Sequence, residues 1–202
     1  MTAEAVSMSA RPQIGIQSAW PRFEADEREA ALKVLTSGKV NALVHGGECE
    51  AFAAEFAEFL GVPHAICMAN GTVTLEIALR ALGIGAGDEV IVPARSFFAT
   101  ASCVAAVGAM PVFADVLSPS QNIDPCSVER MITSQTKAVI CVHLAGWPCD
   151  MPALADLCDR HELFLVEDCA QAHGAAIDGR KVGTFGDAAS FSFCTDKIMS
   201  TG

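Results

Sequence analysis

The chain has 202 residues, and its 24 acidic residues outnumber its 13 lysines and arginines, which gives a net charge of -11. Such a surface repels nucleic acid and anionic membranes, so neither is expected as a partner. Hydrophobic residues make up 51% of the chain and charged residues 18%. This composition suits a well-buried globular protein and argues against intrinsic disorder.

The cysteines and the apolar segments indicate a cytoplasmic protein. The nine cysteines are scattered and form no CxxC pair, which predicts reduced, buried thiols and no metal site. The N-terminus has an early acid, Glu4, and no apolar core, so a signal peptide is not expected. Residues 96–114 carry no charge, a length that raises the question of a membrane span. Gly108 and Pro111 divide this stretch, which favours a helix followed by a strand.

The first 60 residues predict an N-terminal helical segment, residues 1–60. An amphipathic helix is expected over residues 24–35, because it opens with acids and stops at a Ser-Gly pair. A turn is expected over residues 44–48 and a second helix over 49–60. Three phenylalanines, Phe52, Phe56 and Phe59, share one side of that helix and are expected to pack in the core.

From residue 61 the pattern alternates between strands and helices. Strands are expected over residues 64–69, 89–93, 110–116, 137–144, 163–167 and 188–193. Helices are expected over residues 71–82, 97–107, 125–133 and 151–161. Continuous apolar runs such as AVICV and LFLV suit strands that are buried on both faces of a parallel sheet. The sequence therefore predicts a three-layer α/β/α domain with a mainly parallel sheet over residues 61–202.

An acid and a lysine follow two of these apolar runs. Asp168 comes at the end of LFLVE, and Lys197 follows SFSFCTD. Ligands of open α/β sheets lie at the carboxyl ends of the strands. An acid that holds a pyridine nitrogen protonated and a lysine that carries the cofactor as a Schiff base are what a pyridoxal phosphate (PLP) enzyme needs. Glu167 should point to the opposite side of the sheet, because side chains alternate along a strand.

Three further features allow a structural interpretation as well as a functional one. Gly71 and Thr72 open a helix, so their amides suit a phosphate, although a plain turn and cap is the commoner reading. One of two adjacent rings, Phe97 or Phe98, can stack on a flat cofactor, although packing in the core is the default interpretation. Gln171 and His173 follow Asp168 in a loop, where each is more often structural.

The set of motifs resembles the DegT/StrS family of PLP-dependent sugar aminotransferases, which have the aspartate-aminotransferase fold (fold type I). The matching stretches include ANGTVTLEIALRALGIGAGDEVIVPARSFFATAS, GAMPVFADV, TKAVICVHLAGWPCDM, VEDCAQAHGA and FSFCTDK. They run in order through nearly the whole chain.

This resemblance implies specific roles for several residues. Lys197 and Asp168 are implied as catalytic, with Lys197 bonded to the cofactor and Asp168 paired with the pyridinium nitrogen. The other implied cofactor contacts are Gly71, Thr72 and Ser192 at the phosphate, Phe97 on the ring and Gln171 near the 3-hydroxyl. Cys194-Thr195-Asp196 departs from the commonest form of the family motif, which leaves the substrate open.

The resemblance also implies substrates and partners. An amino donor, usually glutamate in this family, passes its amino group to a nucleotide-linked keto sugar, and the full-length protein is expected to be a homodimer. Family members are about twice as long, so the large domain is expected to be incomplete at its C-terminal end. A truncated, inactive fragment is therefore one alternative. A related sugar dehydratase is another, but those enzymes replace the lysine with histidine, so Lys197 counts against it.

Overall fold

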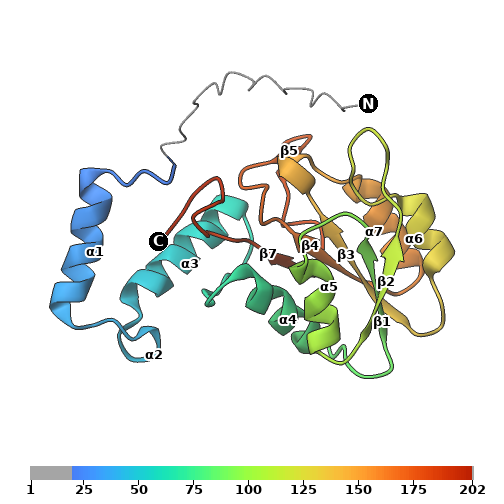
Figure 1. Ribbon diagram of the computed structural model, residues 1–202, viewed down its shortest axis with the longest axis horizontal. Coiled ribbons are helices and arrows are strands. Elements are labelled where there is room, and N and C mark those ends of the chain that lie inside the picture. The colour runs from blue at the N-terminus through green and yellow to red at the C-terminus, as the bar shows by residue number, and fades with distance from the viewer. Residues whose placement is uncertain (1–19, 202) are drawn as a thin grey trace, which may run out of the picture.

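The computed structural model describes residues 20–201 as a parallel sheet covered by helices, with a helical N-terminal part beside it (Figure 1). The first 19 residues, which begin the expected segment 1–60, lie outside the described residues, as does Gly202. The helices, in chain order, are α1 (Ala25–Ser37), α2 (Ala42–His45), α3 (Gly47–Leu60), α4 (Gly71–Ala81), α5 (Ala99–Ala106), α6 (Pro125–Met131) and α7 (Met151–Arg160).

Five parallel strands form the main sheet. They are β1 (Glu89–Pro93), β2 (Met110–Ala114), β3 (Thr136–Val142), β4 (Phe164–Asp168) and β7 (Ala188–Ser190). Their order in the sheet is β2-β1-β3-β4-β7. The chain places β2 on one side of β1 and the later strands on the other. The order therefore reverses between β1 and β3, where open α/β sheets bind their ligands.

Alternating side chains of the strands build two separate cores, one on each face of the sheet. Val90 and Val166 pack with α4 and α5 in one core. Ile91 and Leu165, one residue away along the same strands, pack with α6 and α7 in the other. This period of two explains why the strands read as continuous apolar runs. The expected three-layer α/β/α fold is confirmed.

The helical part before Gly61 makes fewer buried contacts. Helix α1 begins with a capping box, in which the Glu27 side chain accepts the Glu24 amide at 2.6 Å, and it ends at Gly38 in the left-handed conformation. No residue of α1 is buried, and in Figure 1 this helix stands away from the sheet. Local capping thus defines α1, while packing against the sheet does not.

Three sequence-based expectations differ from the structure. Residues 64–69 form no strand, and Ile66 is 71% exposed. Residues 42–45 form the short helix α2, which overlaps the start of the turn expected over residues 44–48. Strand β7 ends at Ser190 because the following chain leaves the sheet to pack Phe191 and Phe193 against α3. In addition to these three segments, the glycine-rich stretch before β7 contains a two-stranded hairpin, β5 (Ala176–Ile177) and β6 (Arg180–Lys181).

The uncharged stretch 96–114 contains α5 and β2, as expected. Among the described residues, none of the helices has both the length and the apolar character to cross a membrane. All nine cysteines are free thiols. All nine were expected to be buried. Five of them are buried, and four are exposed: Cys49, Cys67, Cys126 and Cys194. The expectation of buried thiols therefore holds only in part.

Candidate active site

Asp168 is the last residue of β4, at the carboxyl edge of the sheet. It is paired with Val142 of β3 on one side and with Ser190 of β7 on the other. Its side chain is on the same face as that of Val166, which packs with α4 and α5. The alternation of β4 sends Glu167 to the opposite face, where Leu165 packs with α6 and α7. The expected opposite orientation of these two acids is confirmed.

The Asp168 carboxyl group is 5% exposed and has two hydrogen-bond donors. Oδ1 accepts the amide of Ala170 at 3.1 Å, and Oδ2 accepts the hydroxyl of Thr100 at 3.2 Å. Burial raises the pKa of Asp168, and these two hydrogen bonds together with the charge of Lys197 offset only part of that rise. Within residues 20–201, no cation forms an ion pair with this acid, so a bound cation would stabilise it.

Lys197 lies in the loop after β7, and its side chain is 16% exposed. A backbone hydrogen bond of 2.9 Å from its amide to Cys194 closes the turn that presents the side chain. Nζ lies 3.0 Å from Oδ2 of Asp196 and 5.9 Å from the ring centroid of Phe97. The structure thus brings Lys197 and Phe97 together, although they are 100 positions apart in the sequence.

Phe97 and Phe98 occupy the turn between β1 and α5, at the carboxyl edge of the sheet. Their side chains are 66% and 78% exposed. Core packing, the default interpretation of these rings, is therefore wrong. An exposed ring beside a half-buried lysine is instead available to a flat ligand.

Gly71, Thr72 and Ser192 meet at the start of α4. Asn70 caps this helix by accepting the amide of Val73 at 3.0 Å. In the part of the chain that the structure describes, the amides of Gly71 and Thr72 donate no hydrogen bond to the protein. A Cβ on Gly71 would lie 3.2 Å from Cβ of Ser192 and 3.6 Å from its Oγ. Free amides at a helix N-terminus beside a hydroxyl form a cradle for a phosphate.

Hydroxyl contacts fix this cradle to the sheet. Thr74 donates to the Gly71 carbonyl at 2.7 Å, and its hydroxyl lies 2.5 Å from that of Ser190. Ser190 also reaches the Gly71 carbonyl at 3.3 Å. Because Ser190 is paired with Asp168 across the sheet, the same strand end positions the helix N-terminus and the buried acid.

Substitution of Gly71 with alanine should separate helix stability from phosphate binding. The new Cβ meets Ser192 at 3.2 Å, closer than ordinary contact, so the cradle must widen. Alanine also lowers the entropic cost of the helix by up to about 1 kcal/mol. We expect a chain of equal or higher thermal stability with about tenfold weaker PLP binding, measured by fluorescence titration. A Gly47→Ala variant is the control, since an added Cβ there meets no atom within 4 Å.

Gln171 is oriented by the turn that follows β3. Its Oε1 accepts the amide of Ala145 at 2.6 Å, and Ala145 has a positive φ of 53°. The side-chain amide nitrogen of Gln171 donates to no residue in the described range 20–201. The NH2 group of Gln171 is therefore available as a hydrogen-bond donor on the loop after Asp168. The expected contact with a 3-hydroxyl needs a donor of this kind.

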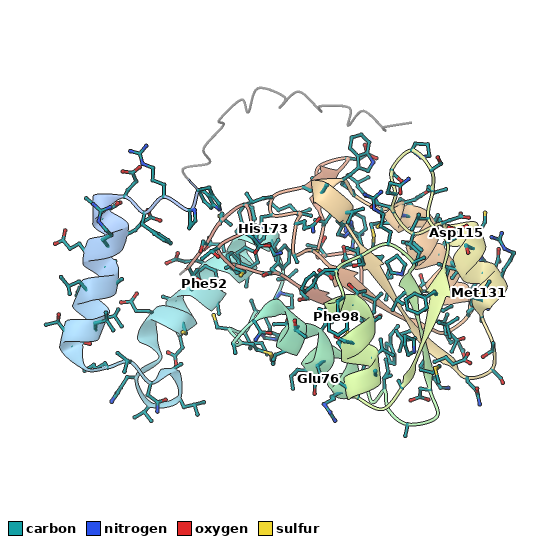
Figure 2. All side chains as sticks on the ribbon, viewed as in Figure 1. Phe52, Glu76, Phe98, Asp115, Met131 and His173 are labelled. Carbon is teal, nitrogen blue, oxygen red and sulfur yellow. The ribbon has the colours of Figure 1, made fainter. Side chains whose placement is uncertain are left out.

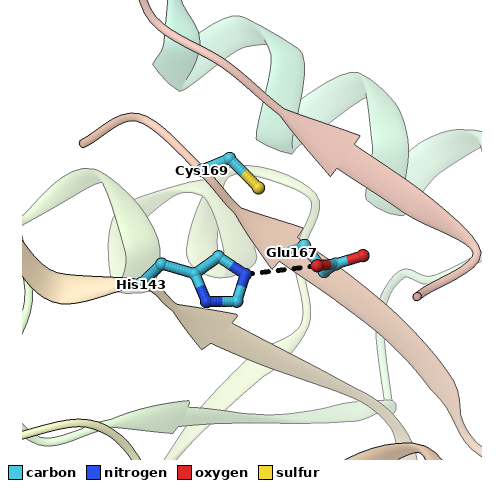
Figure 3. A group of neighbouring side chains, drawn as sticks. All are labelled: His143, Glu167 and Cys169. Atoms are coloured by element: carbon cyan, nitrogen blue, oxygen red, sulfur yellow. Dashed lines mark hydrogen bonds and ion pairs between the residues drawn. The ribbon is translucent and has the colours of Figure 1, made fainter. Parts of the chain in front are cut away.

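A buried pair that sequence reasoning did not single out lies beneath this edge (Figure 3). His143 and Glu167 are both 0% exposed, with Nε2 of the ring 3.2 Å from Oε2 of the acid. Because Nδ1 of His143 accepts the amide of Cys149 at 3.0 Å, the ring hydrogen lies on Nε2 and is donated to Glu167. The sequence signal was present: an acid inside a buried strand needs a donor partner.

Glu167 also holds the glycine-rich loop that precedes β7. Its Oε1 accepts the amides of Phe185 and Gly186, at 2.7 and 2.8 Å, and its Oε2 accepts the amide of Gly183 at 2.8 Å. Burial raises the pKa of Glu167, but the bonds from His143 and these amides outweigh it and hold the pKa below 4.5. Cys169 approaches the same pair closely enough to suggest a metal site, yet each oxygen of Glu167 already accepts two hydrogen bonds.

We expect Glu167→Gln to destabilise the chain by about 2–3 kcal/mol. Each carboxylate oxygen of Glu167 accepts hydrogen bonds from two donors. In either orientation, the side-chain amide of the glutamine variant places its NH2 group, which is itself a donor, against two of these donors. The pKa of Glu167 is lower in the folded state than its usual 4.5, so its contribution is complete above that pH and is lost as the pH falls. Urea unfolding should therefore show a large difference at pH 7 that shrinks below about pH 4.5.

The control for this substitution is Glu129→Gln. Glu129 pairs with Arg160 at the surface, where both side chains are about half exposed, so the loss should be under about 1 kcal/mol. An equal loss in the two variants would contradict the structural role of Glu167.

His173 joins an aromatic cluster between the sheet and α3 (Figure 2). Its ring lies 4.9 Å from Phe193 and 5.5 Å from Phe191, and Phe193 lies 5.0 Å from Phe52. Both ring nitrogens of His173 are buried. Burial lowers the pKa of His173, a hydrogen bond with the backbone of Ser192 opposes this shift, and the charge of Lys197 adds to it. The cluster thus connects α3 to the loop that carries Lys197.

The sequence matches the DegT/DnrJ/EryC1/StrS aminotransferase family over residues 21–202. The chain belongs to this family. The match covers β4, β7 and the loop to Lys197, and therefore all of the candidate site.

Two curated relatives and two solved structures illustrate the similarity. The chain is 45% identical over 182 residues to a GDP-perosamine synthase of Vibrio cholerae, covering 90% of this chain and 49% of the relative. It is 46% identical over 187 residues to an L-glutamine:2-deoxy-scyllo-inosose aminotransferase of Streptomyces lividus, covering 91% and 44%. The chain thus spans about half the length of the curated relatives it matches.

The solved structures agree with this relationship. An aminotransferase from Psychrobacter cryohalolentis superimposes with a TM-score of 0.89 at 52% identity, covering 92% of this chain and 47% of that one. A protein from Streptococcus pneumoniae described as a sugar aminotransferase, in a PLP form, has a TM-score of 0.85 at 30% identity and covers 90% and 49%. The fold is therefore that of the PLP-dependent aminotransferases of fold type I.

Proposed function

We propose that this protein is a PLP-dependent aminotransferase that moves an amino group from an amino acid to a keto sugar. The observation that carries the proposal is the convergence of three residues at one sheet edge. Asp168 is a buried acid with no ion-pair partner among residues 20–201, Lys197 is half-buried, and the ring of Phe97 is exposed. Membership of the aminotransferase family supports it.

The donor set of the site fits the cofactor. The amides of Gly71 and Thr72 and the hydroxyl of Ser192 suit the phosphate, since they are donors grouped at a helix N-terminus. Phe97 offers a flat apolar face, and the free amide nitrogen of Gln171 suits the 3-hydroxyl. When bound, PLP supplies a carbonyl group that bonds amines and a ring that accepts electrons from the adjacent carbon.

The residues of the chain then have separate tasks. Asp168, ionised, holds the proton on the ring nitrogen, because a buried carboxylate and a cation stabilise each other. Lys197 would bind the cofactor covalently between turnovers and, once released, would take the proton from the reacting carbon of the amino donor and deliver it to the carbonyl-derived carbon of the cofactor. Asp196 and Phe97 flank its ammonium group and hold it at the site edge.

We propose a nucleotide-linked keto sugar as acceptor and glutamate as donor. The name of the Vibrio cholerae relative, a GDP-perosamine synthase, supports a nucleotide-linked sugar. The Streptomyces lividus relative is named for L-glutamine and a scyllo-inosose, a cyclic ketone without a nucleotide. Both donors and both acceptor types therefore belong in the test.

We further propose a cytoplasmic homodimer, with the large domain over residues 61–202. The exposed apolar side chains of α1, α2 and the residues between them support a partner surface, because apolar side chains gathered on a surface mark contact sites. They are 62–97% exposed and comprise Leu32, Leu35, Val40, Leu43 and Val44.

Transfer of a 15N label tests the activity. The chain is incubated with PLP, a 15N-labelled amino donor and a keto sugar, and the amino sugar is analysed by mass spectrometry. We expect label to move from glutamate to a nucleotide-linked keto sugar. Transfer only from glutamine, or only to a keto cyclitol, would correct the substrate proposal. A chain that binds PLP and transfers no label would be a cofactor-binding portion, and one that does neither would refute the proposal.

A further inference from the structure

We propose that Ser96 and Thr100 form a hydroxyl relay that holds the Asp168 carboxylate in its ionised form and in position for the ring nitrogen. Thr100 is then a positioning residue that acts on the cofactor through Asp168. This last step rests on the proposed function, but the hydrogen bonds that carry the relay belong to the chain itself.

Thr100 is the second residue of α5, and its side chain is 1% exposed. Oγ1 donates to Oδ2 of Asp168 at 3.2 Å, across 68 positions of sequence, and the same oxygen lies 2.6 Å from Oγ of Ser96. An ionised carboxylate only accepts hydrogen bonds, so the single hydroxyl hydrogen of Thr100 is committed to Asp168.

The direction of the relay follows from this commitment. Since Thr100 donates to Asp168, its oxygen must accept from Ser96, and the hydrogen bonds run from Ser96 through Thr100 to Asp168. Aligned hydrogen bonds strengthen one another, so Ser96 makes Thr100 a better donor. Ser96 directly precedes Phe97, and a single turn of chain therefore carries both the relay and the ring that faces the site.

Asp168 has few other groups around it that could stabilise its ionised form. The other direct donor is the Ala170 amide, and the nearby ionisable groups are His143 after β3, Lys197 after β7, and the thiols of Cys103 and Cys169. The pKa of Cys103 is raised to about 12 by burial, so this thiol is neutral. Thr100 is thus one of only two hydrogen-bond donors to the acid among the described residues.

Titration of the cofactor-free chain tests the relay directly. Aspartate carboxyl carbons are labelled with 13C, the Asp168 signal is assigned with Asp168→Asn, and its midpoint is followed by NMR. Thr100→Val keeps the shape of the side chain and removes the hydroxyl. We expect it to raise the Asp168 midpoint by about one pH unit, because a hydrogen bond to a charged group is lost. Thr100→Ser should keep the wild-type midpoint, and Ser96→Ala should shift it in the same direction as valine, by less.

Cofactor binding gives the second measurement. At a pH below the wild-type Asp168 midpoint, where binding must also ionise the acid, we expect Thr100→Val to raise the Kd for PLP about tenfold, which corresponds to the same one-unit shift, and Thr100→Ser to leave it unchanged. The matched control is Thr136→Val. Thr136 is also buried, at 4% exposure, but it begins β3 at the opposite edge of the sheet. The Thr136→Val chain should lose a comparable amount of stability, while the Asp168 midpoint and the Kd for PLP should stay unchanged.

The outcomes separate the relay from the proposed function. A folded Thr100→Val chain with the wild-type Asp168 midpoint and the wild-type Kd overturns the relay. So does an equal shift with Thr136→Val. If the wild-type chain binds no PLP, the proposed function fails, while the NMR midpoint still decides whether Thr100 controls the acid.

Discussion

Lys197→Ala should abolish the covalent attachment of PLP completely. In the wild-type chain, borohydride reduction with PLP should add one cofactor, and peptide mapping should locate it at Lys197. The reason is position: this lysine is half-buried next to Phe97 at the carboxyl edge of the sheet, within the site that holds Asp168. Amino transfer should fall by about 10²–10⁴-fold, because proton transfer at the reacting carbon loses its general base.

The control for this variant is Lys181→Ala. The Lys181 ammonium lies 4.7 Å over the ring of Phe59, away from the sheet edge, so its removal should leave the adduct intact. Thermal stability should stay close to wild type in Lys197→Ala, since its ion pair joins an exposed partner, Asp196. A reduced adduct that maps to Lys181, or survives in Lys197→Ala, would refute the assignment.

Asp168→Asn should weaken PLP binding by about a hundredfold to several thousandfold, because removing one member of a buried ion pair costs about 3–5 kcal/mol. Amino transfer should be lost as well, since a neutral amide does not keep the ring nitrogen protonated. Binding is measured by fluorescence titration and transfer by the 15N assay.

The stability of the same variant should change in the opposite direction. Burial raises the pKa of Asp168 above its usual 3.8. In the cofactor-free chain, the acid's favourable contribution is therefore complete at low pH and is lost as the pH rises through the folded-state pKa. At pH 7 the asparagine chain should be at least as stable as wild type in urea unfolding. Asp124→Asn, an N-cap of α6 where either residue serves, is the control and should change neither quantity.

An element could be predicted from the sequence where short-range interactions define it, and could not where long-range interactions do. Helices α3, α4 and α6 lie close to the expected residues, because their ends are defined locally: Asn70 and Asp124 cap α4 and α6, and Gly61 ends α3 in the left-handed conformation. The expected strand at 64–69 was wrong, because an apolar run becomes a strand only where a neighbouring strand pairs with it, and Ile66 stays exposed.

The residues of the candidate site also fall into those that could be predicted from the sequence and those that could not. Asp168 and Lys197 were recognisable from the sequence because an acid and a lysine after buried apolar runs are chemically unusual, and the family motifs surround them. The relay from Thr100 and the support of Glu167 by His143 were not recognisable. They join residues 68 and 24 positions apart, and no local pattern connects such positions.

The sequence by itself determined the class of the fold, the family and the chemical types of the candidate site residues, because these depend on short-range patterns and on motifs in order. The tertiary structure decided which residues meet: Phe97 lies beside Lys197, Ser192 beside Gly71, and Thr100 beneath Asp168. Only the pairing of β1, β3, β4 and β7 brings these segments to one edge, since parallel strands align their carboxyl ends.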